Sequence, residues 1–184
     1  MITRVTVLLT SSRTVTGTLE HGEHRLSDAL NSSLTSVLHV TSATLGRLGN
    51  PQANEPVSVA VVPKAQAALI LVQDELRRPE EKRLNPYASK RTSELLVLIS
   101  GLRLRGQAHV GAHLDPLELQ RQLAAGGDRF VVLTDAWLAL DVEGETERHV
   151  GLAMLNARHI QFVAALSAEP TAGQRVRRDP VAAR

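Results

Sequence analysis

The sequence contains no cysteine. This absence excludes disulfide bonds, thiol catalysis and thiolate metal sites. Aromatic residues make up only 2% of the chain, whereas hydrophobic residues in total make up 43%. The aromatic residues are Tyr87, Phe130, Trp137 and Phe162. Because the hydrophobic fraction is that of a folded protein, we expect a core built from Val, Leu, Ile and Ala.

The chain also lacks a long apolar run and a strong charge of one sign. Residues 1–5 lead directly into a strand-like segment, without the apolar stretch of a signal peptide or a membrane span. We therefore expect a soluble cytoplasmic protein with no membrane partner. The formal net charge is only +2 over 184 residues, which is weak evidence for a nucleic-acid partner.

The sequence does contain two diverged copies of one pattern. When Val7 is placed opposite Leu96, several small and polar residues coincide. They are Ser11 with Ser100, Gly17 with Gly106, Gly22 with Gly111, and His24 with His113. After a short insertion the match resumes at Thr41 with Thr134 and Ala43 with Ala136. Because these matches occur in the same order, they predict an internal duplication.

Each copy starts with an apolar, β-branched segment, followed by a segment that alternates with period two. In the second copy Leu102 and Leu104 fall on one face, and Arg103 and Arg105 fall on the other. This alternation is typical of a half-buried strand. Gly106 lies on the inward face, where it permits a sharp bend or a close backbone approach.

A short helix is expected to interrupt the strands of each copy. In the second copy Asp115, Pro116 and Glu118 form a helix-start pattern, and in the first copy the helix covers residues 26–31, where Ser27 and Asp28 suit a helix start. Three more strands follow in each copy, at 37–45, 57–62, 67–72, 130–140, 149–155 and 160–164. Residues 49–51 and 143–145 are predicted as turns.

These elements predict an all-β protein with short helices, built as two tandem small barrels of SH3-like or Sm-like type. The first barrel covers residues 1–72, a charged linker covers 73–93, the second barrel covers 94–166, and a disordered basic tail covers 167–184. A unit of this size buries only a modest core. We therefore expect the copies to pack on each other or on another chain.

The first copy contains Gly17, Leu19 and His21, followed by Arg-Leu-Ser-Asp-Ala-Leu-Asn at residues 25–31. This pattern resembles that of a bacterial family of small β domains of unknown function. Residues 130–136 in the second copy are similar to the family's next strand. The second copy departs at 114–117, where Leu-Asp-Pro-Leu replaces the Ser-Asp motif. The resemblance implies a small β domain and supplies no catalytic residues.

The predicted outward face of the second copy carries a basic stripe, formed by Arg103, Arg105, Gln107 and His109. Side chains on one strand face are able to contact successive phosphates. The corresponding residues of the first copy are neutral or acidic: Thr14, Thr16, Thr18 and Glu20. The stripe is thus a possible nucleic-acid-binding face, or else an ordinary solvated strand face. The same alternative applies to Arg175, Arg177 and Arg178 in the tail.

Other candidate sites have weaker support. His21, His24, His109 and His113 suggest a metal site, but Gly22 and Gly111 predict turns there, and no complete ligand set accompanies them. Ser27 and Asp28 near His24 lack the nucleophile elbow of a hydrolase. No Gly-rich phosphate loop of known spacing is present.

The sequence therefore predicts no enzyme, no cofactor and no evident small-molecule substrate. We predict a non-catalytic interaction or scaffold module that self-associates as a homo-oligomer or binds a protein partner. The alternative is a nucleic-acid-binding protein that uses backbone phosphate contacts from the second repeat and the basic tail.

Overall fold

A computed structural model describes residues 2–22, 25–48, 50–75, 91–110, 129–142 and 145–166. In these residues the chain is mostly β, as the sequence predicts. The strands are β1 (Ile2–Leu9), β2 (Arg13–Glu20), β3 (Val37–Arg47), β4 (Asn50–Pro63), β5 (Ala67–Glu75), β6 (Arg91–Ile99), β7 (Leu102–Val110), β8 (Phe130–Leu140), β9 (Arg148–Asn156) and β10 (Ile160–Ala165). The helices are α1 (Leu26–Asn31) and the 3₁₀ turns η1 (Lys64–Gln66) and η2 (Ala157–His159).

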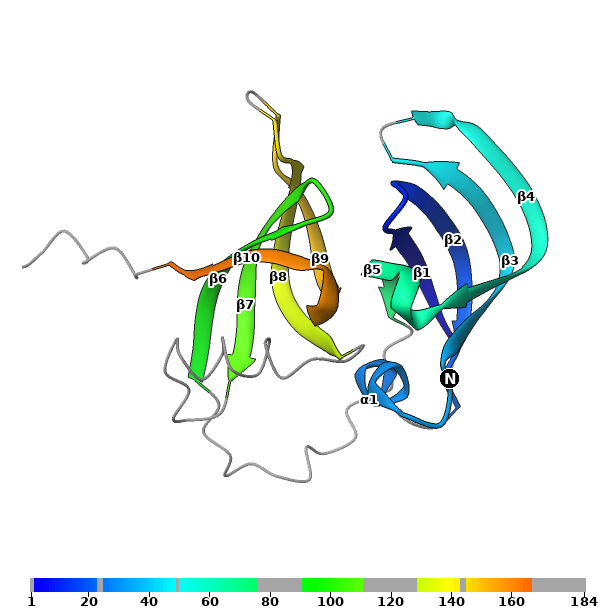
Figure 1. Ribbon diagram of the computed structural model, residues 1–184, viewed down its shortest axis with the longest axis horizontal. Coiled ribbons are helices and arrows are strands. Elements are labelled where there is room, and N and C mark those ends of the chain that lie inside the picture. The colour runs from blue at the N-terminus through cyan, green and yellow to red at the C-terminus, as the bar shows by residue number, and fades with distance from the viewer. Residues whose placement is uncertain are drawn as a thin grey trace, which may run out of the picture.

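The described strands form one antiparallel sheet in the order β10-β6-β7-β8-β9-β5-β1-β2-β3-β4. The first half of the molecule contains β1 to β5 and the second half contains β6 to β10, and each half curls into its own layer (Figure 1). Within each half the last strand returns to pair with the first. The sheet is not closed in the described residues, so the two closed barrels expected from the sequence are not confirmed.

In each half, the backbone of a neighbouring strand passes close to a glycine. These glycines, Gly17 and Gly106, are aligned with each other in the repeat. A Cβ atom on Gly17 would lie 2.7 Å from the carbonyl oxygen of Thr41, and one on Gly106 would lie 3.1 Å from that of Thr134. The strand register shifts beside both glycines. The close approach expected at Gly106 is therefore present, and Gly17 has the same role in the first half.

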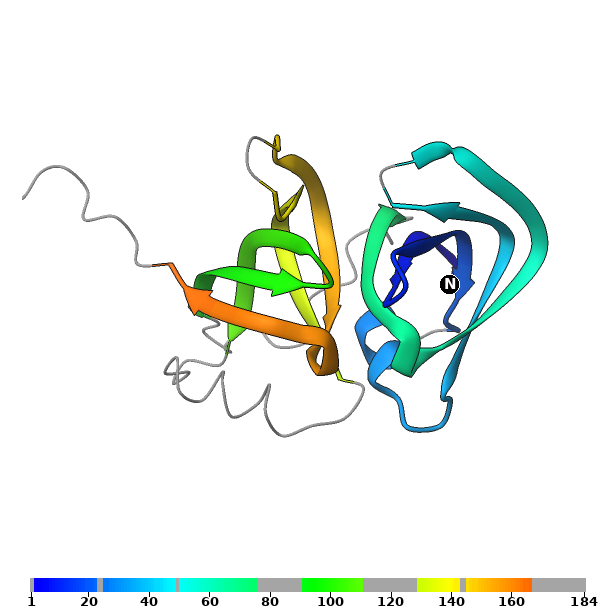
Figure 2. The same ribbon diagram turned by 45° about the horizontal axis from the view of Figure 1, so that its top comes forward.

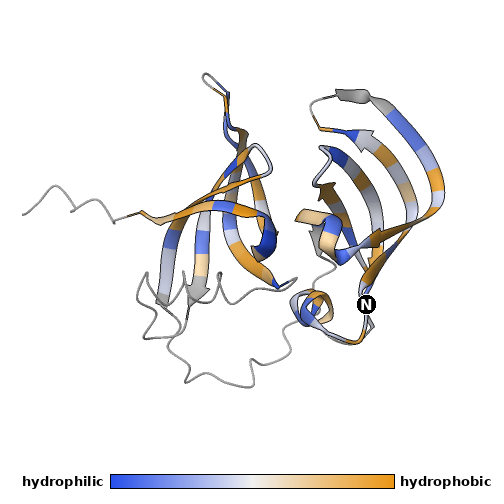
Figure 3. Cartoon of the chain, viewed as in Figure 1, coloured by the Kyte–Doolittle hydropathy of each residue, from blue (hydrophilic) through white to orange (hydrophobic). Residues whose placement is uncertain are grey.

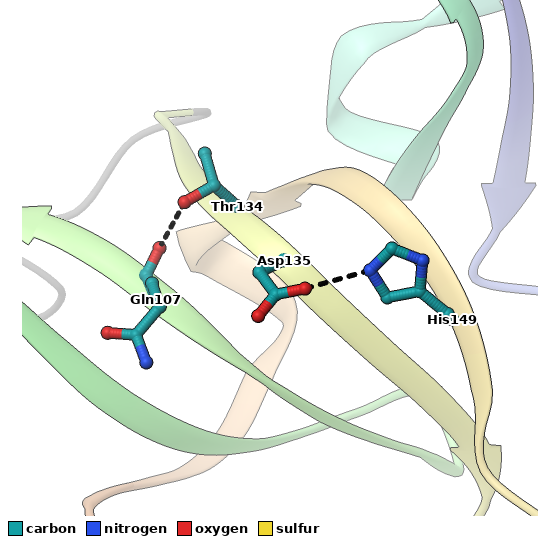
Figure 4. A network of polar contacts seen from close by, with 4 residues as sticks. All are labelled: Gln107, Thr134, Asp135 and His149. Atoms are coloured by element: carbon teal, nitrogen blue, oxygen red, sulfur yellow. Dashed lines mark hydrogen bonds and ion pairs between the residues drawn. The ribbon is translucent and has the colours of Figure 1, made fainter.

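The partner strand bends in the same way in both halves. Ser42 on β3 has φ 48° and Asp135 on β8 has φ 49°, a left-handed conformation that is uncommon for residues other than glycine. On the preceding residue, Thr41 donates a hydrogen bond to the carbonyl oxygen of Thr18, and Thr134 donates one to that of Gln107, both 3.3 Å long. Figure 4 shows the second of these bonds. These paired bends curl each half around its own core.

The alternation of β7 is as the sequence predicts. Leu102, Leu104 and Ala108 are buried, whereas the side chains of Arg103 and Arg105 reach the surface. Figure 3 shows hydrophobic and hydrophilic residues following one another along the strands. Most buried side chains are Val, Leu, Ile and Ala, and the large additions to this set are Phe130 and Met154.

Several predicted boundaries are wrong. The turn expected at 49–51 is shorter, because β3 continues to Arg47 and β4 already begins at Asn50. β4 is an edge strand, where proline is tolerated because one row of N–H groups has no ladder partner. The linker expected at 73–93 is also shorter, because β5 extends to Glu75 and β6 begins at Arg91.

Helix α1 has the predicted bounds, but Ser27 and Asp28 do not cap it as the sequence suggests. Its N-cap residue is Arg25, which makes no side-chain capping hydrogen bond, and Ser27 donates instead to Asp28 at 3.4 Å. The helix predicted after Asp115, the turn at 143–144 and the tail at 167–184 lie outside the described residues. In the part of the chain that the structure describes, no helix has the length and apolar character needed to cross a membrane.

Candidate functional site

The two halves meet edge to edge, where β5 pairs with β9 in an internal junction. The paired residues are Leu69 with Leu155, Ile70 with Met154, Leu71 with Ala153, and Val72 with Leu152. All are apolar, and all except Leu71 and Leu152 are buried. Both strands have cores on both faces, and such strands are continuously apolar rather than alternating. The junction is thus a structural part of the core.

Side chains cross the junction in both directions. Phe130 and Met154 come from the second half but are buried in the core of the first half. Leu8 and Leu69 come from the first half but are buried in the core of the second. Each half therefore completes the core of the other.

Polar side chains hold one end of the junction in place, where β5 begins and β9 ends. The fully buried amide of Asn156 donates to the carbonyl oxygens of Lys64 and Ala67, at 3.1 and 3.0 Å. The Asn31 side chain accepts a hydrogen bond from the Phe130 N–H and donates one to its carbonyl oxygen, which joins α1 to β8. These hydrogen bonds fix the register at which the halves meet.

The outer strands of the described sheet, β4 and β10, form its two free edges. β4 borders the first half on the side away from the second, and β10 crosses the second half toward its far side (Figures 1 and 2). Large hydrophobic side chains are exposed on both edges: Val59 and Val61 on β4, and Phe162 on β10. Exposed apolar edge strands are suited to pairing with another chain.

An apolar groove, here called the edge groove, lies along β4. Its volume is about 390 Å³. The side chains that line it include Leu9, Val15, Leu45, Val57 and Val59. Within the described part of the chain, the free edge of the first half therefore offers both unpaired backbone and a place for an apolar side chain.

A second cleft, of about 730 Å³, lies between the two halves and is lined by residues of both. Its lining includes Arg47 from β3, Arg148 from β9 and threonine side chains of the first half. Thr6 is hydrogen-bonded to Thr16 at 3.0 Å, and it accepts a hydrogen bond from Gln73 at 2.7 Å. The hydroxyl groups of Thr6 and Thr16 in this cleft are thus already engaged within the protein.

The structure brings only part of the predicted basic stripe together. Arg103 lies 3.8 Å from a carboxylate oxygen of Glu147, and Arg105 lies 3.4 Å from one of Glu94. Both arginine side chains are partly exposed, at 40% and 45%. His109 belongs to β7, but its side chain lies outside the described parts, as do Arg175, Arg177 and Arg178. Sequence alternation found the arginines but not their acidic partners, which come from other segments.

The predicted histidine sites are not assembled in the described residues. His21 lies 2.9 Å from the Thr3 hydroxyl, and His24 and His113 fall outside the described ranges. In those ranges no group of three or more His, Asp or Glu residues is placed to hold a metal ion. A pair that the sequence did not suggest is His149 and Asp135, 2.9 Å apart at the surface (Figure 4).

No family model, curated protein or solved structure matches this chain.

Proposed function

We propose that this protein is a non-catalytic scaffold module that self-associates through its strand edges. The single observation that carries the proposal is the internal junction, in which two similar halves already join edge to edge through β5 and β9. The outer edges of the same two halves, β4 and β10, expose apolar side chains instead of burying them. Because pairing of strand edges already joins the two halves within one chain, we expect the outer edges to join separate chains in a similar way.

We propose further that each half is a small barrel unit of SH3-like or Sm-like type, derived from one ancestral unit. The shared strand order, the paired glycines and the shared bends at Ser42 and Asp135 support this proposal. The 3₁₀ turn that precedes the last strand of both halves also supports it. Such folds host many unrelated functions, so the fold type alone assigns no activity.

The oligomeric state tests the scaffold proposal directly. We expect sedimentation velocity of the full chain to show species larger than a monomer, whose fraction increases with protein concentration. Because the edge contacts are apolar, we expect them to persist when the salt concentration is raised. A protein that stays monomeric over the whole concentration range would rule the proposal out.

Nucleic-acid binding is the alternative function. Arg103 and Arg105 share one face of β7, and both side chains are partly exposed. Against it, both guanidinium groups already face carboxylates. Labelled RNA and DNA at low salt test this function. Binding that weakens steeply with salt, and that R103E/R105E abolishes, would establish phosphate contacts at this stripe.

A further inference from the structure

The internal junction and the free edges are built from equivalent segments. β9, η2 and β10 follow one another just as β4, η1 and β5 do, and both turns contain three residues. When the two turns are aligned, Leu69 of β5 corresponds to Phe162 of β10, and Met154 of β9 corresponds to Val61 of β4. The free edges of the described sheet are thus the counterparts of the two strands that form the internal junction.

From this equivalence we propose that β10 of one copy pairs antiparallel with β4 of a second copy, in the register of the internal junction. The inference rests on the self-association proposed above and names its surface and its geometry. Transferred from β5 and β9, the register places Phe162 opposite Val62, Val163 opposite Val61, Ala164 opposite Ala60, and Ala165 opposite Val59.

Exposure distinguishes the covered positions from their uncovered counterparts. Leu69 is 1% exposed at the internal junction, whereas its counterpart Phe162 is 48% exposed on β10. Met154 is 3% exposed, whereas its counterpart Val61 is 56% exposed on β4. Pairing of β10 with β4 would bury both Phe162 and Val61, in the way that the internal junction buries Leu69 and Met154.

The edge groove supplies the receiving site for Phe162. At the internal junction Leu69 is buried in a core that contains Leu104 and Leu138, with Val150 packed against it. The repeat matches these three residues to Val15, Leu45 and Val57, and all three line the edge groove. Phe162 of a second copy would therefore enter the first half where Leu69 enters the second.

Two features keep this contact short and weaker than the internal junction. Pro56 and Pro63 of β4 lie on either side of the residues that pair, and proline donates no ladder hydrogen bond. Pro63 also stands where β9 has Asn156, whose amide makes two hydrogen bonds across the internal junction. A reversible contact between copies is the expected result.

The two edges differ, so the contact is heterologous and joins copies head to tail. Contacts of this kind generate a ring where the rotation closes, and an open filament where it does not. An isologous contact, in which two β4 strands pair about a twofold axis, is the geometric alternative. The two arrangements place different residues opposite each other, which makes them separable by cross-linking.

Engineered cysteines test the register, because the natural chain contains no cysteine. Opposed residues of an antiparallel pair lie close enough for a disulfide bond. In the full chain we expect V61C/V163C to form covalent multimers under mild oxidation. Mixed V61C and V163C chains should give dimers, and either single variant alone should give none. The matched control V61C/A164C has one cysteine on the opposite strand face, so it should lose the cross-link.

The outcomes separate this inference from the proposed function. If sedimentation shows oligomers but V61C alone or the V61C/A164C control also forms cross-links, the proposal of self-association would stand. The register between β10 and β4 would then be wrong. A protein that is monomeric at every concentration would overturn both. The head-to-tail contact would be established if V61C/V163C forms multimers, the mixed single variants form dimers, and neither the single variants by themselves nor the V61C/A164C control forms a cross-link.

A substitution gives a second test that does not depend on disulfide geometry. F162K places a charge in the apolar groove, and we expect it to weaken self-association by about tenfold or more. L34K is the matched control, because Leu34 is a fully solvated apolar residue outside both edges. Equal association of F162K, L34K and the unmodified chain would overturn the assignment of Phe162 to the contact.

Discussion

At the scale of single residues, Gly17 and Gly106 occupy the same position in the two halves but leave different amounts of space. A Cβ on Gly17 would lie 2.7 Å from both the Thr41 carbonyl oxygen and a methyl carbon of Val40, a distance that requires the backbone to shift. On Gly106 the closest approach would be 3.1 Å. We expect G17A to lower the free energy of unfolding by about 1–3 kcal/mol and G106A to lower it by less.

Urea unfolding at one fixed protein concentration measures both glycine variants. S33A, in an exposed loop, is the control and should change the free energy of unfolding by less than about 0.5 kcal/mol. A smaller loss for G17A than for G106A would contradict the distances on which the prediction rests.

Asn156 is a fully buried polar residue whose amide makes two hydrogen bonds across the internal junction. N156L removes the donor to the carbonyl oxygens of Lys64 and Ala67 and the acceptor for the Arg158 N–H. Because two carbonyl oxygens at the buried junction each lose a hydrogen bond, we expect a loss of about 1–3 kcal/mol in the free energy of unfolding. The measurement is again urea unfolding, with the exposed T146A as control. An N156L protein as stable as its control would show that the amide contributes little.

At the scale of elements, α1 is too short to be stable alone and depends on its anchors. The ammonium group of Lys64, on a buried side chain of η1, donates to the carbonyl oxygens of Ala29 and Ser32 at the end of α1. K64M keeps the apolar stem of this side chain and removes those donors. We expect faster amide hydrogen exchange over residues 26–31 in K64M, with exchange in β6 and β7 unchanged. Equal acceleration in all three elements would indicate global destabilisation instead.

The elements also show which structural features the sequence can specify. Alternation and turn residues placed most strands and α1 correctly, because those signals are local. β4 was predicted too short because Gly49, Asn50 and Pro51 favour a turn, and proline is compatible with a strand mainly when that strand lies at an edge. The edge position follows from the packing of the whole sheet, which no local pattern contains.

The candidate sites follow the same rule. Arg103 and Arg105 could be placed on one face from their spacing, whereas Glu147 and Glu94 become their neighbours only through the fold. The internal junction has a local signal in the unbroken apolar run at 69–72, since a strand with one solvated face would alternate. That run predicts burial on both faces but does not identify β9 as the partner.

At the scale of the whole molecule, the exchange of side chains makes the two halves interdependent. Phe130 and Met154 fill the first core, and Leu8 and Leu69 fill the second. Burial of one such side chain contributes about 1.5–3 kcal/mol. Together these contributions are comparable with the whole stability of a small domain, about 5–15 kcal/mol. We therefore expect neither half to fold stably when it is produced alone.

A protease site inserted between β5 and β6 of the full-length protein tests this dependence. We expect cleavage to leave the circular dichroism spectrum unchanged, because the ladder between β5 and β9 and the exchanged side chains still hold the halves together. After cleavage the unfolding temperature should fall on dilution, since unfolding now separates two chains. The uncut protein with the same insertion is the control and should depend less on concentration. Halves that separate after cleavage and each unfold cooperatively, at the temperature of the intact chain, would show that the two cores are independent.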